Sequence, residues 1–314
     1  MNAKNRGVAW RLLAIFAVLA MIVAACGSEE EGGGDGDGDT ADTTAPADGE
    51  GDGSLLEELR EAGSVTVGVA NEVPYGYEDE DTGEVTGEAP EIAKLIFEEL
   101  GVPEMEAVVT EFGGLIGGLQ SGNFDMIAAG MFINPDRAEQ VLFTDPDYCV
   151  LESMLVPEGN PDGLTDYASV AETDAVLAVA SGTVNVDYAV WAGIPDDQIE
   201  EFSGIEDQYD ALAAGRVDAV SGTVLTVQQH ADVMEGYEAL PAFPALDEEG
   251  NEVYGCGGFG FRYENQGLRD AFNEVLNEMK KDGTVADIVE DFLGLRTLAE
   301  DAQDVTLEDL VGEG

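Results

Sequence analysis

The residues best suited to chemistry in this sequence flank a junction between a predicted strand and a predicted helix. Phe132 offers an apolar ring face, and Arg137 offers a planar cation that can pair with a carboxylate. The apolar run 125–129 predicts a buried strand that ends before Gly130, and 135–141 predicts a helix with Asn134 as its N-cap. Such a junction presents backbone N–H groups where open α/β sheets bind small ligands. Taken singly, each side chain also fits a structural role, Phe132 in the core and Arg137 in a surface ion pair.

Catalytic chemistry has few candidates in this chain. The single histidine, His230, falls on a predicted helix with no motif around it, and Glu72 is a residue that could act as a base. The cysteines and the histidine do not form a zinc-binding pattern, and no phosphate-binding loop is present. The sequence therefore predicts no enzymatic activity, no cofactor and no metal, with an extracytoplasmic enzyme as the alternative.

Alternating helix and strand patterns predict an α/β fold from Ser54 onward. Apolar residues at helical spacing predict helices at 55–61, 90–100, 115–119, 205–214 and 268–279, and a further helix after the turn 181–185. Strands are predicted at 65–69, 106–110, 175–180 and 217–220, and extended segments at 150–156 and 257–261.

An internal repeat favours two similar units within this region. The segments 119–125 and 212–218 each read as the end of a helix, a glycine stop and the start of a strand, with aspartate at the same place. Because helix–glycine–strand is a common pattern, chance is the alternative. The shared order favours two α/β units of related design.

The N-terminal residues predict export. Residues 1–25 combine three basic residues with an apolar run that is short for a membrane span, and they end at a sequence resembling a bacterial lipobox. That resemblance implies lipid attachment to Cys26. Residues 26–53 are rich in Gly, Asp and Glu and predict a solvated tether. If Cys26 is acylated, Cys149 and Cys256 remain, and an even pair in an exported protein favours a disulfide over two buried thiols.

The charge balance is strongly acidic, with 67 Asp and Glu residues against 12 Lys and Arg residues and a net charge of −55. Such a surface repels nucleic acid and anionic lipid. It also repels itself, and at ~1 M salt, where the Debye length is about 3 Å, that repulsion is screened. We therefore expect a salt-loving bacterial source, and a monomer that contacts the membrane only through its lipid anchor.

Over residues 64–295 the chain resembles the family 3 solute-binding proteins of bacterial ABC importers. The resemblance is carried by Phe143-Thr144-Asp145-Pro146, by Gly215-Arg216-Val217-Asp218-Ala219 and by Gly258-Phe259-Gly260-Phe261-Arg262. It implies a periplasmic-binding-protein (Venus-flytrap) fold, in which two α/β lobes are joined by two crossover segments and the ligand lies in the cleft. By analogy, lobe one is 54–150 plus 257–314, lobe two is 151–256, and the crossovers begin near Cys149 and Cys256.

Within that family the chain is most similar to the ectoine/hydroxyectoine-binding proteins. The motifs that carry this similarity are Asn71-Glu72-x-Pro74-Tyr75-Gly76-Tyr77, Thr86-Gly87-Glu88-Ala89-Pro90-Glu91 and Gly130-Met131-Phe132-Ile133. The resemblance implies that a carboxylate holds the ring nitrogens, an arginine takes the ligand carboxylate and aromatic rings enclose the ring. The residues predicted to bind ligand are Glu72, Tyr75, Phe112, Gly130, Phe132, Arg137, Thr183 and Asn185.

The predicted function follows from that resemblance. We expect an extracytoplasmic lipoprotein of the cell membrane that captures ectoine or hydroxyectoine and delivers it to the permease and ATPase subunits of an importer. A polar or charged amino-acid-binding protein of the same family is the alternative. Against it, Thr223 stands where amino-acid binders of the family usually carry an aspartate for the ligand's α-ammonium.

Overall fold

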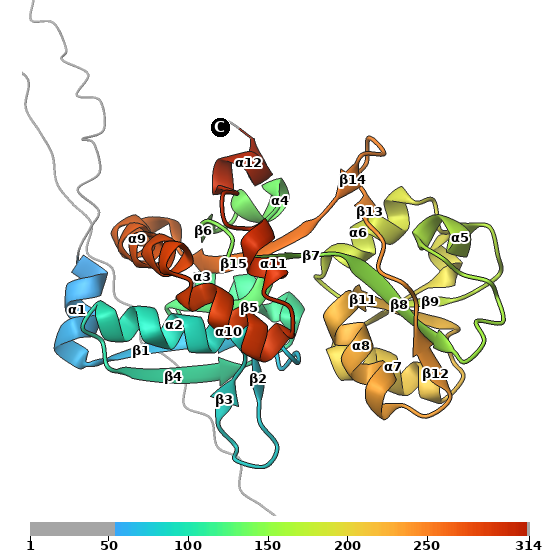
Figure 1. The fold of residues 1–314 in the computed structure, drawn as a ribbon, viewed down its shortest axis with the longest axis horizontal. Coiled ribbons are helices and arrows are strands. Elements are labelled where there is room, and N and C mark those ends of the chain that lie inside the picture. The colour runs from blue at the N-terminus through green and yellow to red at the C-terminus, as the bar shows by residue number, and fades with distance from the viewer. Residues whose placement is uncertain (1–53, 313–314) are drawn as a thin grey trace, which may run out of the picture. The chain divides into compact units, whose positions relative to one another are not determined.

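Two β-sheets organise the chain (Figure 1). The computed structural model describes residues 54–312, so the predicted signal segment, the tether and Cys26 lie outside the described residues. No helix within the described part of the chain is both long enough and apolar enough to cross a bilayer.

The larger sheet has the strand order β4-β1-β5-β15-β6, and β7 pairs with β15. Its strands are β1 (Ser64–Val69), β4 (Glu104–Val109), β5 (Met126–Phe132), β6 (Leu142–Phe143), β7 (Tyr148–Val150) and β15 (Gly255–Phe261). The helices on this side are α1 (Ser54–Ala62), α2 (Glu88–Glu99), α3 (Leu115–Gln120), α4 (Pro135–Ala138), α9 (Gln266–Asp282), α10 (Thr284–Leu293), α11 (Thr297–Asp301) and α12 (Leu307–Val311). We call this sheet and these helices lobe one.

The alternation of side chains along β5 explains why lobe one has helices on both faces of its sheet. Met126 and Ala128 belong to the core that includes the apolar side of α2, whereas Ile127 and Ala129 pack with the apolar residues of α3. Successive side chains of a strand point to opposite faces, and all four are buried. Because both faces are covered, the strand reads as a continuous apolar run.

The smaller sheet has the order β10-β9-β11-β8-β12. Its strands are β8 (Glu152–Pro157), β9 (Leu177–Ala180), β10 (Ile199–Phe202), β11 (Ala219–Thr223) and β12 (Tyr237–Ala239). The helices that follow or precede these strands are α5 (Tyr167–Ala171), α6 (Val184–Trp191), α7 (Ile205–Ala213) and α8 (Val224–Val233). We call this sheet and these helices lobe two. Two short hairpins complete the chain, β2 (Tyr77–Glu78) with β3 (Val85–Thr86), and β13 (Ala245–Leu246) with β14 (Glu252–Val253).

The repeat found in the sequence forms the same pair of hydrogen bonds in each lobe. In lobe one the Asp125 carboxylate accepts a hydrogen bond from the Thr66 backbone N–H at 3.0 Å, and the Asp125 N–H donates to the Thr66 carbonyl. In lobe two Asp218 makes the same pair of contacts with Val176, at 2.9 Å for the carboxylate. Each aspartate joins the start of its strand to the neighbouring parallel strand. The α/β fold and its two related units are therefore confirmed.

Two predicted boundaries at the strand–helix junction are wrong. The strand β5 continues through Gly130 to Phe132, because β15 pairs antiparallel with it at Met131 and Phe132. The helix α4 ends at Ala138 rather than at residue 141, because the chain must turn to place Leu142 in β6 against β15. The predicted helix start is correct, with Asn134 as N-cap.

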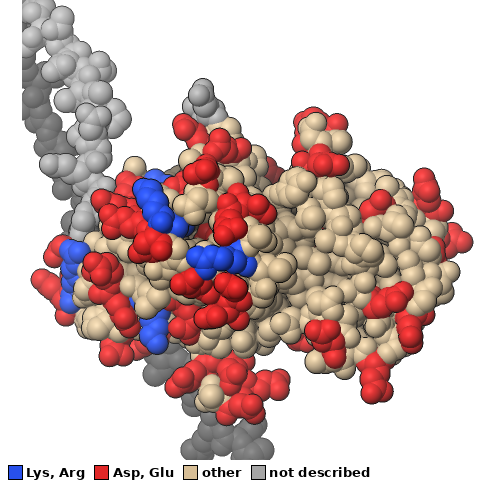
Figure 2. Space-filling model, viewed as in Figure 1, with Lys and Arg blue, Asp and Glu red and all other residues tan. Residues whose placement is uncertain are grey.

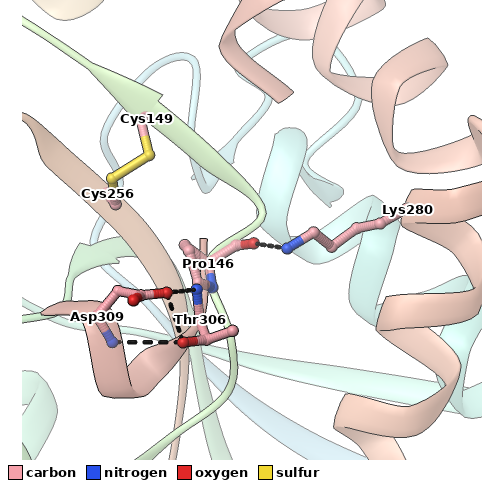
Figure 3. Close-up of a disulfide and its surroundings, with 6 residues drawn as sticks. All are labelled: Pro146, Cys149, Cys256, Lys280, Thr306 and Asp309. Atoms are coloured by element: carbon pink, nitrogen blue, oxygen red, sulfur yellow. Dashed lines mark hydrogen bonds between the residues drawn. A yellow bond between two sulfur atoms is a disulfide. The ribbon is translucent and has the colours of Figure 1, made fainter. Parts of the chain in front are cut away.

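The two crossover segments lie side by side (Figure 3). Cys149 of β7 and Cys256 of β15 are directly paired across the antiparallel ladder, and their sulfurs are bonded at 2.05 Å. Just before β7, the Pro146 carbonyl accepts a hydrogen bond from the buried Lys280 ammonium at 2.7 Å. Near the same place α12 begins, and Thr306 is its N-cap. Contacts from α9 thus hold the first crossover where it leaves lobe one.

The charge distribution differs between the two lobes. Figure 2 shows acidic side chains over both lobes, whereas the lysines and arginines visible on this face lie over lobe one. Between Glu152 and Ala239, the bounds of the second sheet, the only Lys or Arg is Arg216. Lobe two therefore has almost no basic side chains with which to neutralise its acids.

Candidate functional site

A cavity between the lobes is lined by strand, helix and loop residues of both lobes. All of the residues predicted from the sequence to bind ligand line it, and their direct role in binding stays a prediction. The cavity has a volume of about 40 Å³. The lobes therefore stand close together, and a ring-sized ligand needs some separation of the lobes to enter.

Arg137 forms the cationic part of the cavity. The local fold positions it, because its backbone N–H donates to the Asn134 side chain at 2.8 Å at the start of α4. Its guanidinium donates to the Phe132 carbonyl at 2.7 Å and, across the cleft, to the Gly182 carbonyl at 3.0 Å. The side chain is buried, and burial lowers the pKa of Arg137 to about 10, so it stays charged at neutral pH. Two of its five N–H donors are used, and the others are available to an anion.

No acidic side chain forms an ion pair with this cation within residues 54–312, since none lies within 4.0 Å of the guanidinium, and only the more distant charge of Asp187 favours its charged form. Instead, the guanidinium carbon lies 5.4 Å from the centre of the Phe112 ring, a cation–π contact. A buried charge without a counter-charge is costly unless a ligand supplies it. Arg137 is thus suited to a ligand carboxylate.

Glu72 supplies the opposite charge from the loop that follows β1. A tight turn holds this loop, since the Tyr75 and Gly76 N–H groups both donate to the Glu72 carbonyl, at 2.9 and 3.0 Å. From lobe two, the Thr226 hydroxyl donates to the Glu72 carboxylate at 2.8 Å. Burial raises the pKa of Glu72 to about 7, against the smaller opposing effect of the Thr226 hydrogen bond. The residue can therefore change its ionisation when a charged ligand arrives.

The aromatic residues of the site are also core residues. Tyr75 stacks on Tyr148 with ring centres 5.2 Å apart, and its hydroxyl donates to Thr223 of lobe two at 2.8 Å. Gly130 makes this stack possible, because its φ is +59° and a Cβ there would lie 2.7 Å from the Tyr75 ring. Phe132 and Phe112 are buried and line the cavity. For these rings the core role and the site role coincide.

Lobe two places Thr183 and Asn185 at the start of α6. Thr183 is the N-cap residue, and its hydroxyl donates to the Ala180 carbonyl at 2.7 Å. The Asn185 amide donates to the Glu152 carboxylate at 2.6 Å and to the Tyr167 hydroxyl at 2.9 Å. Burial raises the pKa of Glu152 to about 7. The first residues of α6 line the same cavity as Arg137, and a helix N-terminus suits an anion.

The backbones of the two lobes touch at this end of the cavity. A Cβ on Gly182, whose φ is +80°, would lie 2.6 Å from the Gly113 Cα of lobe one. Together with the Arg137–Gly182 hydrogen bond, this contact closes the cavity beside the guanidinium. Only glycine allows so close an approach of the two chains.

Several lining residues of lobe two are not among the predicted ligand-binding residues, namely Gln208, Tyr209, Ser221 and Thr226. A signal for Gln208 was present, since it falls on the apolar face that Ile205 and Leu212 define on α7. A polar side chain at such a position is buried, and a buried polar group needs a partner. His230, by contrast, is structural. It bonds to the Thr226 carbonyl at 2.8 Å and stacks on Tyr209.

No metal centre is found in the described part of the chain, where no group of three or more His, Cys, Asp and Glu side chains is arranged to hold an ion. The cavity instead combines one cation, one carboxylate and aromatic rings. That combination suits non-covalent binding of a small ligand that bears both charges.

Several known proteins are similar to this chain in sequence or in fold. The probable amino-acid ABC transporter periplasmic-binding protein y4tE of Sinorhizobium fredii is 37% identical over 228 residues, which cover 72% of this chain and 75% of that protein. The crystal structure of EhuB in complex with hydroxyectoine has 33% sequence identity and a TM-score of 0.76, covering 84% of this chain and 100% of that chain. The ancestral amino acid-binding protein AncCDT-1, a precursor of cyclohexadienyl dehydratase, has 28% identity and a TM-score of 0.67, covering 76% and 99%.

A family of transporter proteins also matches the greater part of the fold. Residues 65–295, which include both sheets, match the bacterial extracellular solute-binding proteins, family 3. Both predictions, of the family and of its two-lobe periplasmic-binding-protein fold, are confirmed. The chain therefore belongs to the bacterial extracellular solute-binding proteins, family 3.

Proposed function

We propose that this solute-binding protein captures ectoine or hydroxyectoine in the cavity between its lobes. One observation carries the proposal. Arg137 and Glu72 are both buried at the same cavity, and neither has an oppositely charged side chain within 4.0 Å among residues 54–312. A ligand that carries both a carboxylate and a delocalised cation would pair with both residues at once.

Ectoine has these two groups on one small ring. Its carboxylate would take the remaining donors of Arg137, in the two-point geometry that a guanidinium offers. Its amidinium would face Glu72 and lie against the rings of Tyr75, Phe112 and Phe132. A cation against an aromatic face gains ~2 kcal/mol when it is desolvated. The similarity to EhuB, whose crystal structure is a complex with hydroxyectoine, supports this assignment.

An amino-acid ligand is the second candidate, favoured by the similarity to the y4tE protein. An α-amino acid would place its free ammonium near Thr223, where the family's amino-acid binders usually have aspartate. Here the Thr223 hydroxyl accepts a hydrogen bond from Tyr75 at 2.8 Å and carries no charge. An unbalanced buried ammonium costs several kcal/mol. We therefore expect arginine, glutamine and histidine to bind at least a hundredfold more weakly than ectoine, a difference of about 2.7 kcal/mol.

Isothermal titration calorimetry at molar salt tests this assignment. Ectoine, hydroxyectoine, arginine, glutamine and histidine are each titrated into the same preparation. Tight binding of a ring ligand with weak or no binding of the amino acids supports the proposal. Micromolar or tighter binding of an α-amino acid, with none for ectoine, would replace it with the amino-acid function.

The wider role follows the family, whose members bind small solutes outside the cytoplasm for ABC transporters. We propose that this chain is a monomeric lipoprotein held to the cell membrane through Cys26, that lobe closure creates the surface that its permease recognises, and that the ligand leaves unchanged. Mass spectrometry of ligand after long incubation with the protein tests the last point. A new product would instead indicate an enzyme that uses Glu72.

A further inference from the structure

Two buried polar atoms on the lobe-two side of the cavity have no hydrogen-bond partner among the described residues, and a third, on Ser221, has only a contact with Tyr167 that falls short of hydrogen-bond geometry. The three atoms are Gln208 Oε1, Tyr209 Oη and Ser221 Oγ. Their side chains are only 2%, 3% and 1% exposed, and all three residues line the cavity. Buried polar groups in folded proteins are almost always paired, so such atoms gathered at one cavity point to a ligand group that pairs with them.

These atoms are held by two adjacent elements. Gln208 and Tyr209 are consecutive residues of α7, and Ser221 lies in the middle of β11, two positions before Thr223. Because side chains two apart share a face of a strand, Ser221 and Thr223 both face the cavity. We call the side chains of Gln208, Tyr209 and Ser221 the α7–β11 wall.

The position of the Tyr209 hydroxyl is fixed by His230. The two rings stack almost in parallel, with an angle of 3° between their planes. His230 is itself held at both ring nitrogens, by the Thr226 carbonyl at 2.8 Å and by the Glu206 carboxylate at 3.2 Å. The hydroxyl therefore meets the ligand without much loss of side-chain freedom, which favours a specific contact.

The chemistry of this wall differs from that of the rest of the cavity. Arg137 would pair with the ligand's carboxylate, which only accepts hydrogen bonds. Glu72 would pair with the ligand's amidinium, which only donates them. The α7–β11 wall is uncharged and contains a carbonyl acceptor and two hydroxyls. A hydroxyl group both donates and accepts, so it can give its proton to Gln208 and accept from Tyr209 or Ser221.

We propose that the α7–β11 wall is a hydroxyl-binding site, and that the protein binds the hydroxylated ring, hydroxyectoine, at least about tenfold more tightly than ectoine. This inference rests on the proposed function. A site built around hydrogen bonds to a hydroxyl discriminates strongly against the analogue that lacks it, because the polar groups of the site then stay unpaired.

Calorimetric titration of both rings into the parent protein and two variants tests the proposal. Tyr209→Phe removes one hydroxyl and keeps the ring that stacks on His230, and Ser221→Ala removes another with little change in volume. In each variant the affinity for hydroxyectoine falls more than that for ectoine, so their ratio moves toward one. Tyr237→Phe is the matched control, because its hydroxyl bonds to the Leu212 carbonyl and it does not line the cavity. Its ratio stays at the parent value.

The outcomes separate this inference from the proposed function. If neither ring binds the parent protein, the proposed function itself fails. If both rings bind the parent equally well, the function stands and the hydroxyl site is refuted. A parent that prefers hydroxyectoine, with a preference that Tyr209→Phe and Ser221→Ala leave intact, also overturns it. Thermal unfolding of each variant shows that it is folded, and binding of ectoine by that variant shows that the cavity still forms.

Discussion

Ligand binding should depend on pH through Glu72. Burial raises the pKa of this carboxyl to about 7 in the unliganded protein, chiefly because desolvation disfavours its charge. An amidinium next to Glu72 favours the charged form, so the bound protein should hold Glu72 ionised. Amidinium and carboxylate groups of the ligand do not titrate near neutral pH. A change of affinity in that range would therefore report on the protein.

The size of the effect follows from the ionised fraction. With a pKa of about 7, Glu72 is roughly one-tenth ionised at pH 6 and roughly nine-tenths ionised at pH 8. If only the ionised form binds, the association constant rises about tenfold between these pH values, or about 1.4 kcal/mol, and then levels off. The direction of the proton transfer is fixed. Glu72 has a raised pKa and is partly protonated before binding, so binding of a cation beside it releases a proton. At pH 7 about half a proton per site should be released.

Calorimetry at pH 6, 7 and 8, in buffers that differ in ionisation enthalpy, measures both the affinity and the proton release. Glu72→Gln should bind more weakly and lose the rise with pH, because its amide does not titrate. Glu152→Gln is the discriminating control, since burial also raises the pKa of Glu152 to about 7. That variant should keep most of the rise. A flat profile in the parent, or a rise that disappears only in Glu152→Gln, would refute the assignment to Glu72.

Three further predictions concern charge. Arg137→Ala should lower the binding free energy measured by calorimetry by about 2–5 kcal/mol, because the ligand carboxylate loses its partner. The surface variant Arg296→Ala should leave the affinity unchanged. An Arg137→Ala affinity within twofold of the parent would remove Arg137 from the site. The unliganded protein should melt at a higher temperature at pH 5 than at pH 8. Burial raises the pKa of Glu72 and of Glu152 to about 7, so each carboxyl contributes up to ~3 kcal/mol of stability below pH ~4.5, and this contribution is lost as the pH rises through about 7. The opposite order of melting temperatures would contradict this prediction. Affinity should rise about two- to fivefold from ~0.1 to ~1 M salt, and Asp187→Asn should flatten that rise.

The salt prediction depends on the rim of the cleft. Asp187 of α6 lies opposite Asp136 of α4, and burial together with the charge of Asp136 raises the pKa of Asp187. Both residues line the same depression beside Gly182, where the lobes meet. Asp187 is repelled by Asp136 and attracted by Arg137. We expect salt to weaken the repulsion at the rim more than the attraction to the buried guanidinium. An affinity that falls with salt, or a rise that Asp301→Asn on α11 also removes, would count against this cause.

Local signals in the sequence predicted the lobe-one half of the site. Asn134 and Pro135 define the start of α4 whatever packs around it, and the Arg137 N–H does bond to the Asn134 side chain. The extent of β5 could not be predicted in this way, because its last residues are strand only through pairing with β15, more than a hundred positions along the chain. Strand boundaries of this kind depend on tertiary contacts.

The lobe-two half was harder to predict for a different reason. In the sequence Gln208 stands out only as a polar residue on an apolar helix face, and Ser221 does not stand out at all. The role of both depends on which face of α7 and β11 is turned toward lobe one. Thr226 could be linked to Glu72 only once the two lobes were placed together, since 154 positions separate them. Sequence periodicity identifies a buried face but not the cavity that the face borders.

The same atoms that would hold a ligand also hold the lobes together. Arg137 donates to Gly182, and Glu72 accepts from Thr226, each across the cleft. Closure therefore buries one cation and one carboxyl group with no oppositely charged side chain within 4.0 Å of either among the described residues, which disfavours the closed form until a ligand supplies both charges. A ligand with only a carboxylate, or only an amidinium, would balance one side chain and leave the other unpaired. Selection of a zwitterion would then arise from closure itself, because only a ligand with both groups removes both penalties.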